Sequence, residues 1–226
     1  MSEYDRLFHH PIEKLSEQPF VDINQKSYIL DGGFIAFWGT PGSGKTEAAN
    51  HFEEYSNALI LDIDAIRKTN IYPRASSSEP EIEREELREA FSAQREIGAS
   101  LVAIDGGPIL FTSTGRSSLH RSSLATVAAE CGEPLVRVVV QNTYEELVKR
   151  VLARTPMNTD SNINSVALLD EVIRNTEAYP ADAFYIDGRA PLDLVVGQIL
   201  YHILLSKDAP LIDLINVLNM PPKRFY

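Results

Sequence analysis

A short apolar run that ends at a glycine-rich turn constrains the fold more than any other feature of this sequence. Residues 34–38 read FIAFW and are followed at once by Gly39-Thr40-Pro41-Gly42-Ser43-Gly44-Lys45-Thr46, after which residues 46–55 have a helical pattern. A continuous apolar run bounded by turn residues is typical of a strand that is buried on both faces of a sheet. The segment therefore predicts a strand, a turn and a helix in direct succession.

The same alternation continues along the chain. Four more apolar runs predict strands, at residues 58–61, 101–104, 135–140 and 183–186. Helical patterns accompany them, at residues 81–97, 117–131, 144–154, 165–176 and 192–205. Because strands that alternate with helices form a mostly parallel sheet, the sequence predicts a three-layer α/β fold with five strands and helices on both faces. We assign residues 33–206 to this domain, 1–32 to an N-terminal extension and 207–226 to a helical extension that docks on the domain itself or on a partner.

The glycine-rich turn has the spacing of a phosphate-binding loop, or P-loop. Glycines let backbone N–H groups converge on phosphate oxygens, and the amino end of the following helix favours anions. In a loop of this spacing the lysine, here Lys45, reaches the β- and γ-phosphates, and the hydroxyl of Thr46 binds Mg²⁺. We therefore expect residues 39–46 to bind ATP together with Mg²⁺. The alternative is a glycine-rich turn that holds no ligand.

Polar residues that follow the second predicted strand are further candidates, because ligands of such sheets bind beyond the carboxyl ends of the strands. Asp62 and Asp64 follow this strand, and Arg67 lies about one helical turn beyond Asp64. A carboxylate there can accept a hydroxyl proton or hold Mg²⁺, and an arginine can bind an anionic substrate or the transferring phosphoryl group. We expect Asp62 to assist the metal, Asp64 to act as base and Arg67 to contact substrate. A helix N-cap and a surface salt bridge would explain the same residues.

The apolar run 101–104 closes on Asp105, Gly106 and Gly107. An apolar run that ends in aspartate is the pattern of a Walker B strand, whose carboxylate orients Mg²⁺. Asp105 is thus predicted to be a metal ligand, and the two glycines are predicted to let the backbone approach a substrate closely. An ordinary exit from a strand into a turn is the alternative.

Arg150 and Arg154 are four residues apart on a predicted helix and so share one face. Arg154 opens the polar stretch 155–164, which we expect to form a lid over the nucleotide. A guanidinium group can stack on adenine or bind phosphates. Arg150 is therefore assigned to the nucleotide and Arg154 to the phosphoryl group, with solvent-exposed helix arginines as the alternative.

In the order WGTPGSGKT, LDIDAIR, VAIDGGP and ELVKRVLAR, the chain resembles the small P-loop kinases of the nucleoside-monophosphate-kinase class over residues 34–205. LDIDAIR is similar to the D-x-D of shikimate kinases and to the D-x-x-R of zeta toxins and phage polynucleotide kinase. The resemblance implies that Asp64 is the general base and that Arg67 contacts substrate or phosphate. It also implies that Arg150 packs against the adenine and that Arg154 serves the lid. Arg174 and Tyr179 lie where shikimate kinases have an arginine and a tyrosine, which implies a substrate contact for Arg174.

Together these features predict an ATP- and Mg²⁺-dependent kinase that phosphorylates a hydroxyl group of a small metabolite, similar to shikimate or to a sugar. A kinase that acts on nucleotides or on polynucleotide 5′-hydroxyl ends is one alternative. An ATP-binding regulatory module with little turnover is another. The formal net charge of −11 weighs against a nucleic-acid partner.

The composition is ordinary for a folded domain, with 44% hydrophobic and 23% charged residues. The single cysteine excludes an intrachain disulfide. The first residues lack the pattern of a signal peptide, and the apolar segment 192–205 is too short to span a bilayer. We therefore expect a cytoplasmic protein with no membrane partner. Its oligomeric state stays open, with the terminal extensions as candidate surfaces for self-association.

Overall fold

A five-stranded sheet forms the centre of the molecule. The computed structural model describes residues 3–23, 30, 32–68, 80–105, 108–153, 163 and 165–206. The strands are β1 (Phe34–Trp38), β2 (Leu59–Asp62), β3 (Ile109–Ser113), β4 (Leu135–Gln141) and β5 (Phe184–Asp187). All neighbouring strands are parallel, in the order β2-β3-β1-β4-β5. The predicted α/β class and parallel sheet are confirmed.

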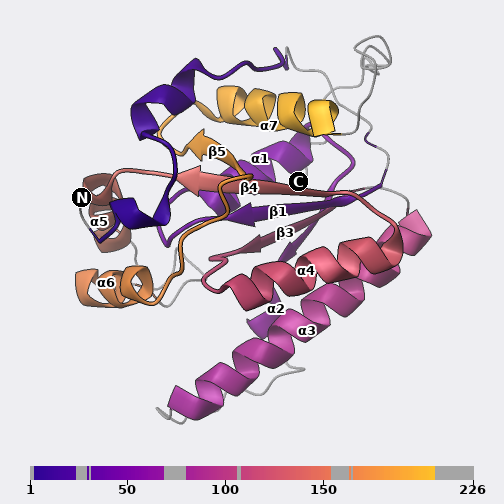
Figure 1. The fold of residues 1–226 in the computed structure, drawn as a ribbon, viewed down its shortest axis with the longest axis horizontal. Helices are drawn as coiled ribbons and strands as arrows, with labels where there is room; N and C mark the ends of the chain where they lie inside the picture. The colour runs from indigo at the N-terminus through magenta and orange to yellow at the C-terminus, as the bar shows by residue number, and fades with distance from the viewer. Residues whose placement is uncertain are drawn as a thin grey trace.

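Helices cover both faces of this sheet (Figure 1). They are α1 (Lys45–Glu54), α2 (Ile63–Lys68), α3 (Pro80–Asp105), α4 (Ser118–Cys131), α5 (Tyr144–Leu152), α6 (Val166–Arg174) and α7 (Leu192–Ser206). Alternate side chains of β1 enter two separate cores. Phe34, Ala36 and Trp38 pack with α3 and α4, whereas Ile35 and Phe37 pack with α1 and α7. Burial on both faces explains why β1 is apolar throughout.

The third strand lies later in the chain than the sequence predicts. Residues 101–104 are helical and belong to α3, which runs without a break from Pro80 to Asp105. The strand is Ile109–Ser113, which follows Pro108 and pairs with β1 and β2. The prediction was wrong because a short apolar run fits the end of a buried helix as well as a strand.

The N-terminal segment packs into the main core. It forms two 3₁₀ helices, η1 (Asp5–Leu7) and η2 (Ile12–Glu17), and buries Leu7 and Leu15 almost completely. The amide of Val21 donates to the carbonyl of Gly197 on α7 at 3.0 Å. A Cβ on Gly197 would lie only 2.3 Å from the carbonyl oxygen of Val21, so the glycine permits this close approach.

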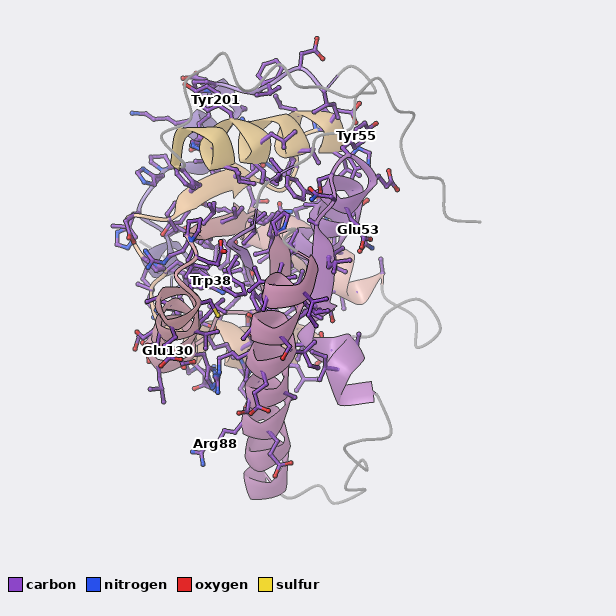
Figure 2. The ribbon with its side chains drawn as sticks, turned by 90° about the vertical axis from the view of Figure 1, so that its right-hand side faces the viewer. Trp38, Glu53, Tyr55, Arg88, Glu130 and Tyr201 are labelled. Carbon is purple, nitrogen blue, oxygen red and sulfur yellow. The ribbon has the colours of Figure 1, made fainter. Side chains whose placement is uncertain are left out.

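The amino-terminal part of α3 extends beyond the sheet (Figure 2), with Arg88 on the extended part. Gln94 donates to the carbonyl of Leu61 at 2.6 Å and marks where α3 passes the carboxyl end of β2. At 1.5 Å per residue, residues 80–93 continue for about 20 Å past this point. Within the described ranges, no helix combines the length and apolar character that a membrane span requires. The predicted lid, apart from Ile163, and the predicted C-terminal helix at 207–226 lie outside those ranges.

Candidate active site

The P-loop adopts a conformation that only glycines reach easily. Gly42 and Gly44 have φ angles of 86° and 95°, in the left-handed region. The amide of Ser43 donates to the carbonyl of Thr40 at 3.1 Å, and the amide of Ala48 donates to Gly44 at 2.9 Å as α1 begins. Successive N–H groups in such a turn form a concave site for anions at the amino end of a helix.

The interior of this loop carries two buried hydroxyl groups. Thr40 and Ser43 are both 0% exposed; the hydroxyl of Thr40 lies beside that of Tyr4, whereas the hydroxyl of Ser43 is hydrogen bonded to no residue in the described part of the chain. Lys45 is half-buried, whereas Thr46 is exposed. Buried polar groups without partners are rare in proteins and favour a site whose ligand completes the hydrogen bonding.

Helix α5 and the turn after β5 both contact the P-loop. A Cβ on Gly42 would lie 3.3 Å from the carbonyl oxygen of Leu147. Arg150, also on α5, donates from its Nε to Glu146 at 3.1 Å and from a terminal nitrogen to the carbonyl of Gly188 at 3.2 Å. The bond from Arg150 is the main cause that lowers the pKa of Glu146. A Cβ on Gly44 would lie 3.0 Å from a terminal nitrogen of Arg150, so this arginine lies against the P-loop, and its contact with the nucleotide stays a prediction.

The carboxyl end of β2 carries the two predicted aspartates, but they do not share one strand face. The strand ends at Asp62 and α2 begins at Ile63. Oδ1 of Asp62 accepts from the amides of Asp64 (2.8 Å) and Ala65 (3.0 Å), and Oδ2 accepts from the hydroxyl of Thr112 on β3. Asp62 thus caps α2, as the N-cap alternative held.

Asp64 lies in the first turn of α2 and is half-buried. Arg67 lies in the same helix, and its side chain is outside the described part. Since β3 stands between β1 and β2, two strand spacings, or about 10 Å, separate β2 from the strand that leads into the P-loop. A substrate placed between them would bridge the aspartates and the loop.

The structure contradicts the Walker B assignment of Asp105. Asp105 is the last residue of α3, and Pro108 just beyond it accepts from the amide of Leu59 at the start of β2. Because the strands are parallel, this is the amino edge of the sheet, whereas the P-loop follows the carboxyl edge. Gly106 and Gly107 lie outside the described residues. The carboxyl end of β3 presents Thr112 and Ser113 instead.

The loop 114–116 follows the carboxyl end of β3 and lies at the edge of the site. A Cβ on Gly115, whose φ is +57°, would lie 2.6 Å from the ring of Trp38 at the end of β1. The guanidinium of Arg121, which is 8% exposed, lies 6.0 Å from the centre of the same ring. Burial lowers the pKa of Arg121, and the carboxylate of Glu177, 3.9 Å away, opposes the shift. In the sequence, the position of this loop could have been predicted from the strand-like run 109–113, which lies between Pro108 and Gly115.

Of the two other predicted arginines, the structure places only one. Arg154 lies outside the described residues. Arg174 ends α6 with an exposed side chain, and its backbone carbonyl accepts from Arg6 at 2.9 Å. In the part of the chain that the structure describes, no three metal-ligating side chains gather into a cluster.

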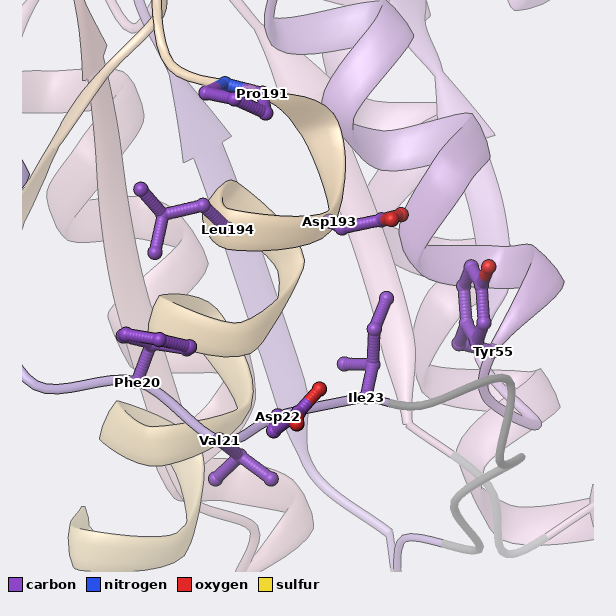
Figure 3. Close-up of a pocket in the computed structure, with 8 residues that line it drawn as sticks. All are labelled: Phe20, Val21, Asp22, Ile23, Tyr55, Pro191, Asp193 and Leu194. Carbon is purple, nitrogen blue, oxygen red and sulfur yellow. The ribbon is translucent and has the colours of Figure 1, made fainter.

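A cavity of about 460 Å³ lies apart from these residues. Residues 20–23, Tyr55 and the start of α7 line it, and Asp22 and Asp193 contribute its carboxylates (Figure 3). None of the predicted site residues lines this cavity.

Comparison with known proteins places this geometry in a family. A family model described as an AAA domain matches residues 34–177, well over half of the chain. No curated protein matches this chain. Solved structures that share the fold include a protein of Chloroflexus aurantiacus, with a TM-score of 0.61 and 16% identity over 76% of this chain and 99% of that chain.

Two enzymes of known class are also similar in fold. A gluconokinase of Sinorhizobium meliloti has a TM-score of 0.56 and 18% identity over 78% of this chain and 95% of its own. The APS kinase of Mycobacterium tuberculosis, solved with AMPPNP and APS, has a TM-score of 0.55 and 19% identity over 76% of this chain and 98% of its own. The protein described above therefore belongs to the AAA domain family and has the fold of the small P-loop kinases.

Proposed function

We propose that this protein is a phosphotransferase that moves the γ-phosphate of ATP to a hydroxyl group of a small metabolite. The observation that carries the proposal is the P-loop itself. Its left-handed glycines shape a nest for phosphate oxygens, and the buried hydroxyl of Ser43 lacks a partner among the described residues. The fold that it shares with a gluconokinase and an APS kinase supports small acceptors that carry a hydroxyl group.

The nucleotide would be held mainly by residues 39–46. Lys45 and the loop amides would bind the β- and γ-phosphates, and Arg150 would lie against the nucleotide above Gly44. Arg154 would balance charge on the phosphoryl group. Water competes with the acceptor for this group, so a closed site is needed during transfer.

Hard oxygen donors near the loop fit a magnesium ion. Thr46 offers an exposed hydroxyl, and Asp62 offers a carboxylate whose orientation is fixed by its bonds to α2 and β3. Oxygen ligands of this kind are those that Mg²⁺ prefers. When bound, the ion would neutralise charge on the triphosphate.

Asp64 is the proposed proton acceptor. Both oxygens of Asp62 already accept hydrogen bonds from the protein, which makes Asp62 a poor base. Asp64, two residues further on in the first turn of α2, is the carboxylate that the D-x-D and D-x-x-R patterns assign to this role. Asp64 would take the proton of the attacking hydroxyl, and Arg67 and Arg174 would contact the acceptor. The acceptor would occupy the space between α2 and the loop after β3, with a shikimate-like or sugar-like molecule as the favoured class.

The direct test is incubation of the protein with ATP, Mg²⁺ and a library of sugars, polyols, shikimate and nucleosides, with mass spectrometry to detect a gain of one phosphate. We expect Lys45→Ala to lower turnover about 10²-fold or more by weakening phosphate binding. Asp64→Asn should lower turnover by a similar factor and leave ATP binding largely intact. Full activity of Asp64→Asn on the true acceptor would remove this residue from the base role.

A nucleotide or a polynucleotide 5′-hydroxyl end is the second candidate acceptor, and one observation favours it. The ring of His120 packs against that of Phe91 of α3 in a tilted arrangement, with the ring centres 4.2 Å apart, and the charges of Arg88 and Arg95 of the same helix act on it. Burial lowers the pKa of His120, and these two arginines lower it further, which indicates local positive charge despite the acidic chain. Adding 5′-hydroxyl oligonucleotides to the library separates the two candidates. ATP binding without phosphate transfer to any acceptor would instead indicate a regulatory module.

A further inference from the structure

Tyr179 connects the N-terminal segment to the edge of the site. This side chain is 1% exposed. Its amide donates to the carbonyl of Leu7 at 3.0 Å, its carbonyl lies 2.8 Å from Nε2 of His9, and its ring stacks on Phe8. Its hydroxyl donates to the carbonyl of Thr114, beyond the carboxyl end of β3, at 2.9 Å. One buried residue therefore contacts both the start of the chain and the loop after β3.

The loop 114–116 is held through all three of its backbone carbonyls. The first accepts from the hydroxyl of Tyr179, and the second accepts from Arg121 at 2.5 Å. The third accepts from the amide of Glu177 at 2.8 Å. Arg121 also donates to the carbonyl of Ala178 at 2.9 Å, so the loop and the segment 177–179 form one hydrogen-bonded unit.

Tyr4 makes a matching contact on the nucleotide side. Its buried hydroxyl donates to the carbonyl of Asn142 at 2.7 Å and lies beside the hydroxyl of Thr40 in the P-loop. Oδ1 of Asn142 accepts from the amide of Thr143, and Thr143 caps α5. The same helix carries Arg150 to the P-loop.

Arg6 binds the carboxyl-terminal end of α6. Its guanidinium donates to the carbonyls of Ile173, Arg174 and Thr176 at 2.9–3.1 Å. Helix ends have backbone carbonyls without partners, and a cation there also suits the helix dipole. The segment that follows α6 leads directly to Tyr179.

We propose that residues 4–9, together with Tyr179, which they contact, form a brace that positions the two sides of the active site independently. Tyr4 sets the nucleotide side, through Asn142 and α5, and Tyr179 sets the acceptor side, through the loop 114–116. Both are positioning residues, because neither is placed against substrate. The inference rests on the proposed function for the roles of the two sides, whereas the brace itself rests on the contacts above.

Two conservative variants test the brace in the full-length chain, each removing one hydroxyl group. Tyr4→Phe should raise the Kd for AMPPNP, measured by calorimetry, about three- to tenfold, and should leave amide exchange at residues 114–116 unchanged. Tyr179→Phe should speed amide exchange at residues 114–116 about tenfold, because one loop carbonyl loses its donor, and should leave the Kd within about twofold. Tyr201→Phe, near the far end of α7 (Figure 2), is the matched control and should change neither quantity.

The outcomes separate the brace from the proposed function. If the unmodified protein binds no AMPPNP, the proposed function fails, and the exchange measurement still decides the acceptor half of the brace. Wild-type affinity in Tyr4→Phe would overturn the nucleotide half, and unchanged exchange in Tyr179→Phe would overturn the acceptor half. A uniform rise in exchange across the chain in both variants would show general destabilisation and would overturn independent positioning.

Discussion

Replacing Gly188 with alanine is expected to displace the P-loop. Gly188 follows β5, and a Cβ there would lie 2.2 Å from the carbonyl oxygen of Ser43. Carbon and oxygen atoms that are not bonded approach to about 3.3 Å, so the two groups would have to separate by about 1 Å. The residue cannot simply move away, because its amide donates to Gln141 at 2.7 Å and its carbonyl accepts from Arg150 at 3.2 Å.

The expected size of the effect follows from this displacement. Inserting a methyl group into a well-packed site costs about 1–3 kcal/mol of unfolding free energy. A shift of about 1 Å in a substrate-positioning element can cost roughly 10²-fold in rate. We therefore expect Gly188→Ala to lose about 2 kcal/mol of stability and to bind AMPPNP at least about tenfold more weakly.

Gly132→Ala is the matched control for this substitution. Gly132 ends α4 with a φ of +71°, and a Cβ there would have no atom within 4 Å. The substitution should cost about 1 kcal/mol of unfolding free energy, because alanine disfavours the left-handed conformation, and it should not change nucleotide affinity. Urea unfolding and calorimetric titration with AMPPNP measure both quantities for both variants. If Gly188→Ala binds AMPPNP like the unmodified protein and is no less stable than Gly132→Ala, the close contact with the P-loop is not required.

Three further predictions test single residues. Asp62→Ala should lower the free energy of unfolding by about 1–2 kcal/mol through the loss of an N-cap, and the melting temperature should fall with it. Asp62→Asn keeps a capping oxygen and should lose less stability. Asp105→Asn should leave the rate and its dependence on Mg²⁺ unchanged, because Asp105 lies at the amino edge of the sheet; a large loss would restore a metal role. Burial lowers the pKa of His202 to about 4. The unfolded chain therefore binds a proton that the folded chain does not between pH 6.5 and 4, so stability should fall as pH decreases through this window. The full shift corresponds to about 3 kcal/mol, and because the imidazole is partly exposed we expect roughly 2 kcal/mol. Urea unfolding of His202→Gln at a series of pH values should show a weaker decline.

The sequence predicted the parts of the fold whose cause is local. The glycines of the P-loop, the apolar run of β1 and the alternation of elements together specify a parallel sheet with the loop at its carboxyl edge. The third strand was missed because residues 101–104 are as apolar as a strand but continue the period of α3. The actual strand, residues 109–113, ends in two hydroxyl residues, which weakens the apolar signal.

The brace could not be predicted, because its contacts join residues that are far apart in the chain. Tyr4 and Asn142 are separated by 138 positions, and Arg6 bonds to carbonyls about 170 positions away. The first residues form 3₁₀ turns without a regular apolar period. Their burial depends on the surface that α6 and β5 present, and neither propensity nor periodicity encodes that surface.

The residues at the carboxyl ends of the strands limit where acid–base and metal chemistry can arise. Next to β1, the strands β3 and β4 end in hydroxyl and amide side chains, Ser113 and Gln141. Among the described strand ends, carboxylates stand only on β2 and β5, and Asp187 of β5 is bound at both oxygens by Arg189. In the proposed phosphoryl transfer, the carboxylate chemistry would therefore fall to the segment 62–64. Because the cap of α2 and the hydroxyl of Thr112 fix Asp62 in place, the proposed metal-facing carboxylate would be rigid, and the proposed base, Asp64, would lie two residues further along the chain.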